Sequence, residues 1–236
     1  MQNKTSAATE QKRRVVDAFT RVLHALMAIT FGLAYITSEM ESLRLVHVTL
    51  GYTLGLVFAV RVIWGLVGPR RVHLRVFIEK LRGLSDFSQK NLQRYDWRSV
   101  LHMVLAVTVV ALLALVLPVI TSGYVTYFKL LGQWTEEVHE VFGNIMLLLV
   151  SCHLAAVVLL SLGKSERQIR PMLTGYVTGK GPNLVTNNLM AVAAAFLLMI
   201  ISLWTWQAYQ YIHDPLLTEQ PSWLHPVGGY KEEDDD

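Results

Sequence analysis

Five long apolar runs constrain this chain more than any other feature of its sequence. Each is about the 20 residues that an α-helix needs to cross the hydrocarbon core of a bilayer. Charged residues make up only 17% of the 236 residues, against about 25% in soluble domains. We therefore expect an all-α membrane protein whose transmembrane helices cover residues 15–36, 45–67, 99–120, 138–162 and 189–212.

The basic residues predict the orientation of these helices, because cytoplasmic segments retain Lys and Arg. With the N-terminus inside, 18 of the 21 basic residues fall on the inner side and 12 of the 18 acidic residues on the outer side. We therefore expect a cytoplasmic N-terminus and an outer C-terminus. Contact with anionic membrane lipid accounts for the basic segments, so we expect no nucleic-acid partner.

Four histidines lie inside these apolar runs at two depths. His139 and His153 are fourteen residues apart in one run, which places them about 21 Å apart along the helix axis. Their side chains then project in directions that differ by only about 40° around that axis, so they share one face of the helix. His24 lies about 18 Å below the outer end of its helix, close to the depth of His153. His47 begins the second helix at the outer surface, as His139 begins the fourth. We name His47 and His139 the outer pair, and His24 and His153 the inner pair.

Two histidine pairs at matched depths predict two haem groups. Neutral imidazole is a good axial ligand for haem iron, and ligation by two histidines favours electron transfer over catalysis, so we assign no catalytic residue. A zinc site would need clustered ligands, and the single cysteine, Cys152, belongs to no Cys-x-x-Cys-His motif. We therefore expect two non-covalent b haems. His102, at the depth of His24, is an alternative inner ligand that the sequence leaves open.

Three further residues are predicted to serve the cofactors. Arg61 lies inside an apolar helix, where a charge costs about 3 kcal/mol, and fourteen residues after His47 it reaches the depth of the inner pair. We expect it to bind a propionate of the inner haem, with snorkelling to the surface as the alternative. Gly51 and Gly55, one and two turns after His47, would allow a flat macrocycle to approach the helix. Small-residue helix packing is the alternative for both glycines.

Short motifs are spread along residues 15–179. They comprise Asp17, Arg21 and His24; His47 with Gly51 and Tyr52; Arg61, Trp64, Gly65 and Gly68-Pro69; Glu137-Val138-His139-Glu140; His153; and Glu166 with Met172, Thr174 and Gly175. Together they resemble the bacterial cytochrome b561 and nickel-iron hydrogenase cytochrome b family. The resemblance implies two b haems in a four-helix core, held by histidines matching His24, His47, His139 and His153. It also implies electron exchange between the quinone pool and a partner. Residues 98–102, at the entry to the third helix, depart from the family's Asn-Pro pattern.

These inferences predict the organisation of the chain. Residues 1–178 form a four-helix transmembrane di-haem bundle, the cytochrome b core, which includes an interfacial helix at residues 70–91. Residues 179–236 form a linker, a fifth transmembrane helix and an acidic periplasmic tail. The resemblance places the protein in the bacterial cytoplasmic (inner) membrane.

The predicted function is electron transfer by a subunit of a quinone-linked oxidoreductase. Electrons would pass between a periplasmic redox protein (a hydrogenase, dehydrogenase or cytochrome c) near the outer pair and a quinone near the inner pair. Two alternatives stay open. One is a self-sufficient superoxide:quinone oxidoreductase, with Lys129 attracting the anion. The other is a membrane anchor or transporter without cofactor, which would show no Soret band.

Overall fold

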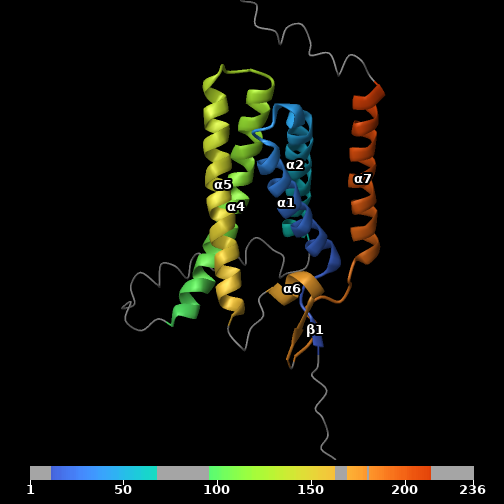
Figure 1. Cartoon of the computed structure of the whole chain (residues 1–236). Coiled ribbons are helices and arrows are strands. Elements are labelled where there is room, and N and C mark those ends of the chain that lie inside the picture. The colour runs from blue at the N-terminus through green and yellow to red at the C-terminus, as the bar shows by residue number, and fades with distance from the viewer. Residues whose placement is uncertain (1–11, 68–95, 163–168, 180, 214–236) are drawn as a thin grey trace, which may run out of the picture. The chain divides into compact units, whose positions relative to one another are not determined.

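The computed structural model describes residues 12–67, 96–162, 169–179 and 181–213. In this part of the chain five helices are long and apolar enough to cross a membrane, as predicted (Figure 1). They are α1 (Ala18–Thr37), α2 (Arg44–Val67), α4 (Trp97–Tyr127), α5 (Trp134–Ser161) and α7 (Met190–His213). The expected interfacial helix at residues 70–91, the motif residues Gly68, Pro69 and Glu166, and the acidic tail lie outside the described residues.

Helices α4 and α5 extend further towards their connection than we expected. The predicted outer segment at residues 121–137 is reduced to residues 128–133, because α4 continues through Pro118 to Tyr127. Proline is tolerated in transmembrane helices, where neighbouring groups satisfy the freed backbone. The hydroxyls of Thr121 and Ser122 donate to carbonyl oxygens one turn back in the same helix. Residues 121–127 are therefore part of the helical bundle and not of the outer connection.

The first four transmembrane helices pack as two neighbouring pairs. Helix α1 packs along α2 and α4 along α5, and α2 also contacts α4 (Figure 1). One cluster of buried apolar side chains draws on all four helices: Phe31, Leu54, Val116, Val119 and Met146. Met146 lies midway between His139 and His153 in α5, seven residues from each. The cluster therefore lies between the two predicted histidine layers.

A small antiparallel sheet, which the sequence did not predict, joins the two ends of this four-helix unit. Strand β1 (Lys12–Arg14) pairs with β2 (Tyr176–Thr178), directly after the short helix α6 (Ile169–Thr174). Gly175 makes the turn between α6 and β2 with a φ of +83°, and its carbonyl accepts hydrogen bonds from the amides of Val15 and Val16. A Cβ at position 175 would lie 2.8 Å from the carbonyl oxygen of Val16, so only glycine fits there.

The segment before α7 is tied to the start of α1. The amide of Leu184 donates to the carbonyl of Arg14 over 2.8 Å, and the amide of Ala18 donates to the carbonyl of Asn188 over 2.9 Å. The chain divides into two compact units, residues 1–193 and 194–236. The linker before α7 is hydrogen-bonded to the first unit, and the predicted domain boundary after residue 178 stays a prediction.

Candidate cofactor-binding site

The two histidines of the outer pair face each other from α2 and α5. Their ring centroids are 6.1 Å apart, with the ring planes at 86°. Nδ1 of His47 lies 2.8 Å from the carbonyl oxygen of Ala34. A carbonyl oxygen can only accept a hydrogen bond, so Nδ1 of His47 carries the proton. The Nε2 lone pair of His47 is therefore available for a metal.

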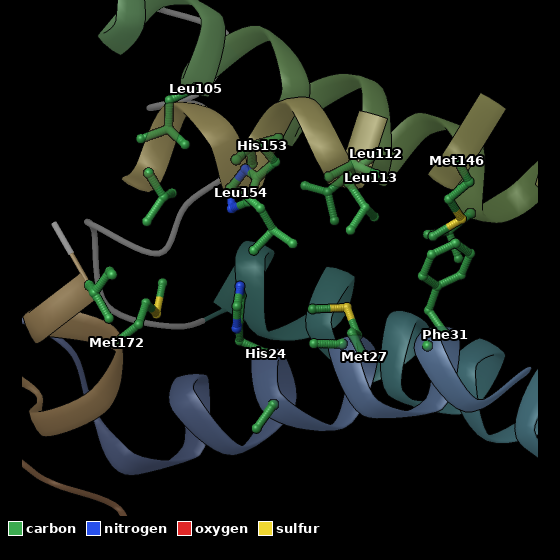
Figure 2. A pocket seen from close by; sticks show the side chains of 18 of the residues that line it. His24, Met27, Phe31, Leu105, Leu112, Leu113, Met146, His153, Leu154 and Met172 are labelled. Carbon is green, nitrogen blue, oxygen red and sulfur yellow. The ribbon is translucent and has the colours of Figure 1, made fainter. Parts of the chain in front are cut away.

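The histidines of the inner pair face each other across a cavity. Figure 2 shows His24 on α1 and His153 on α5 pointing towards one another. The cavity measures about 1570 Å³, against roughly 300–1,000 Å³ for sites that hold drug-sized ligands. Its walls are largely apolar and include Met27, Phe31, Leu112, Leu113 and Met146. The space between the inner histidines therefore suits a large, flat and mostly apolar group.

Three buried polar atoms of residues that line this cavity have no hydrogen-bond partner within the described part of the chain. They are Nε of Arg21, Nη1 of Arg61, whose residue is only 9% exposed, and Nδ1 of His153. Asp17 is fully buried and interacts electrostatically with Arg61. Leaving a buried donor unsatisfied costs about 1–3 kcal/mol. These three atoms therefore have unused capacity to bind a ligand of the cavity.

His102 lines the same cavity from α4, together with His24, His153 and Arg61. The structure thus brings together every residue that we assigned to the inner haem, and also the alternative ligand. The choice between His24 and His102 stays a prediction for mutagenesis.

The glycines beside the histidines differ in their surroundings. A Cβ at Gly51 or Gly143, each one turn after a histidine of the outer pair, would meet nothing within 4 Å. At Gly55 it would lie 3.3 Å from the side chain of Ile120 in α4. Gly51 therefore has the open space that a macrocycle would need, while the surroundings of Gly55 match the helix-packing alternative.

Two residues of α4 at the outer pair were missed by the sequence analysis. Oγ of Ser122 lies 3.0 Å from Nδ1 of His139, and a Cβ at Gly123 would lie 2.8 Å from Cε1 of the same ring. We had expected the helix to end near residue 120. The small-residue pair facing this ring could have been found only if the predicted helix had continued beyond residue 120.

The residue behind one alternative function can also be located. Lys129, the basis of the superoxide hypothesis, is exposed in the connection between α4 and α5. Among the described residues, no group of three or more His, Cys, Asp or Glu side chains could hold a bare metal ion.

The fold and the site define a helical membrane protein with histidines at two levels of a four-helix unit. The chain belongs to the prokaryotic cytochrome b561 family, whose model matches residues 15–175. The two ends of the matched segment are bonded to each other, since the amide of Val15 donates to the carbonyl of Gly175 over 2.9 Å. The protein is therefore a multi-pass membrane cytochrome of the class that binds b-type haem and transfers electrons. Comparisons with curated proteins and with solved structures gave no match.

Proposed function

We propose that this cytochrome carries two b haems and passes electrons between a periplasmic redox protein and the membrane quinone pool. The observation that carries the proposal is the arrangement of four histidines as two facing pairs at opposite ends of one bundle. Each pair takes one residue from the α1–α2 half and one from α5. Haem supplies one-electron chemistry when bound, and ligation by two histidines leaves no open position for a substrate at iron.

The spacing of the outer pair would allow both histidines to hold the iron of one haem. Metal–imidazole bonds are about 2 Å long, so the ring centroids of two imidazoles bound to one metal ion would be about 6 Å apart. The observed centroid separation between His47 and His139 is 6.1 Å. The open space at Gly51 and Gly143 lies one turn from these ligands.

The buried groups around the cavity support haem at the inner pair. A haem carries two propionates, and a guanidinium is well suited to bind a carboxylate. Arg61 is buried, lines the cavity and has a free N–H at Nη1 within the described residues. His24 and His153 would bind the iron, while Arg61 would bind a propionate and the apolar walls would exclude water.

The shape of the same cavity supports a quinone site near the inner pair. The cavity extends past the histidines to the short helix α6, where Pro171, Met172 and Leu173 line it. Met172 is seen at this end in Figure 2. A lipid-soluble quinone has an apolar tail and a head group that accepts hydrogen bonds, and Arg21 and His102 supply polar groups among the lining residues. The quinone would therefore exchange electrons at the inner pair.

The charges at the other end of the bundle support a basic periplasmic partner. The exposed basic residues there are Arg44 and Lys129. Five glutamates at the same end are exposed, namely Glu39, Glu41, Glu136, Glu137 and Glu140. Attraction between opposite charges accelerates the encounter of two proteins. With the N-terminus in the cytoplasm, this acidic end and the outer pair face the periplasm.

The first prediction concerns the haem content of the purified protein. We expect two b haems per chain, both low-spin and both extractable with acid acetone, because no covalent attachment motif is present. A pyridine haemochrome assay, with protein quantified by amino-acid analysis, measures the ratio. A ratio of one would contradict the two-layer proposal, and the absence of a Soret band would favour a cofactor-free anchor.

The second prediction concerns residues 189–236. Deleting them leaves the four histidines and Arg61 in place, and it also keeps the hydrogen bond between Ala18 and Asn188. We therefore expect both haems to stay bound while reduction or oxidation of the outer haem by the periplasmic partner slows at low salt. The acidic residues 232–236 would no longer attract a basic partner. Stopped-flow rates for the full-length and shortened proteins across a salt series test this. Equal rates would make α7 a passive anchor.

A further inference from the structure

We propose that Ser122 and Gly123 of α4 are positioning residues for the outer haem. In this view the Ser122 hydroxyl fixes the tautomer of His139 and lowers the reduction potential of that haem. The inference rests on the proposed ligation by His47 and His139, and it adds two residues that carry no part of that proposal. It starts from the contacts on one ring, that of His139.

The hydrogen bonds around Ser122 determine which atom carries the proton. Oγ of Ser122 donates to the carbonyl oxygen of Val119 over 3.0 Å. A serine hydroxyl has a single proton, so its second contact, at 3.0 Å to Nδ1 of His139, must be as an acceptor. Nδ1 of His139 therefore carries hydrogen, and Nε2 presents its lone pair to a metal.

The two ligands of the outer pair differ in what holds them. His47 donates from Nδ1 to a main-chain carbonyl, that of Ala34, which no substitution removes. His139 donates to the side-chain hydroxyl of Ser122, which a single substitution can remove, and its ring also interacts with the main chain of Val119. A hydrogen bond from the far nitrogen makes a ligating imidazole more basic. A more basic ligand favours ferric over ferrous iron, so the Ser122 hydroxyl should lower the potential of the outer haem.

Gly123 supplies the space that the His139 ring needs. A Cβ at position 123 would lie 2.8 Å from Cε1 and 3.2 Å from Nδ1 of that ring. The first distance is shorter than a carbon–carbon contact allows. Any other residue at position 123 would therefore push the ring away from its place between α4 and α2. Ser122 sets the tautomer of the ring, and Gly123 sets its position.

The test uses the full-length protein in detergent, with both haems titrated potentiometrically by visible spectroscopy. Ser122→Ala should shift the midpoint potential of the outer haem to a more positive value and leave that of the inner haem unchanged. Ser122→Thr, which keeps a hydroxyl, should restore a potential close to that of the wild type. Thr121→Ala is the matched control, because the Thr121 hydroxyl donates to the carbonyls of Leu117 and Pro118 in its own helix.

A second variant tests the space beside the ring. Gly123→Ala should weaken binding of the outer haem by about 10- to 100-fold, the usual effect of disturbing a residue that supports a metal ligand. The inner haem should remain low-spin in this variant, which shows that the protein is folded. The optical spectrum and the haem content per chain are the readouts.

The outcomes separate this inference from the proposed function. A wild-type protein without two haems would overturn the proposed function itself. A wild type with two haems, combined with an unchanged outer potential in Ser122→Ala, would overturn only the role of the hydroxyl. A shift of the same size in Thr121→Ala would also overturn it, because the effect would then come from the helix and not from the bond to His139.

Discussion

Replacing either histidine of the outer pair by alanine is expected to remove the outer haem and to leave the inner haem bound. His47→Ala and His139→Ala should each reduce the haem content from two per chain to about one, because iron with one axial ligand is weakly held. His153→Ala should instead remove the inner haem. The two layers should respond separately because the apolar cluster that includes Phe31 and Met146 lies between them.

The histidines of the inner cavity allow a sharper comparison. His24→Ala should have the same effect as His153→Ala, whereas His102→Ala should leave both haems low-spin. All three are histidines that line one cavity, from α1, α4 and α5, so the variants remove the same side chain from different sides of that cavity. Low-temperature visible spectra and haem content measure the outcome. Loss of the inner haem in His102→Ala, with retention in His24→Ala, would assign the iron to the helix-α4 histidine.

The features that could be predicted from the sequence depend on local chemistry. A run of about 20 apolar residues needs a membrane whatever surrounds it, so all five transmembrane helices were predicted. Because the rise per residue in a helix is constant, the sequence separation of His139 and His153 predicts the difference in their depth in the membrane. The same calculation placed Arg61 at the depth of the inner pair. The structure brings Arg61 and His24 to one cavity, in agreement with that arithmetic.

The features that could not be predicted depend on contacts between distant parts of the chain. Strands of three residues show no periodicity, so the pairing of β1 with β2 left no pattern to detect. The contact between Ser122 and His139 joins two helices and requires knowing how α4 is rotated against α5. The predicted helix at residues 99–120 already contained Pro118, but its last turns, residues 121–127, carry polar and small side chains that the apolar pattern did not include.

Asp17, which the sequence showed only as a motif residue, is a buried charge in the structure. Asp17 is fully buried and caps α1, accepting hydrogen bonds from the backbone amide and the hydroxyl of Thr20 over 2.7 and 2.9 Å. The indole N–H of Trp64 in α2 donates to the same hydroxyl. Asp17 interacts electrostatically with Arg61, also in α2. This network joins the start of α1 to the inner end of α2.

Removing the charge of Asp17 is expected to destabilise the protein more than removing its capping oxygen. Buried charges of opposite sign attract each other more strongly than exposed ones, because water and salt screen them less. Asp17→Asn should lose this attraction and keep the cap, because asparagine caps helices about as well as aspartate. Asp17→Ala should lose roughly 1 kcal/mol more. Each kcal/mol lost corresponds to a fall in Tm of about 2–4 °C for a chain of this size, measurable by thermal unfolding in detergent.

A double-mutant cycle decides whether Arg61 is the source of the effect. In the variant that combines Asp17→Asn with Arg61→Met, the buried cation is absent, so the charge of Asp17 no longer contributes. We therefore expect Asp17→Asn to lower Tm strongly in the wild-type background and very little in the Arg61→Met background. Equal losses in the two backgrounds would show that Asp17 acts only through α1 and Thr20. In that case another group must balance the charge of Arg61. The propionate of the inner haem is the first candidate, and comparing the haem affinity of the Arg61→Met and Arg61→Lys variants tests it.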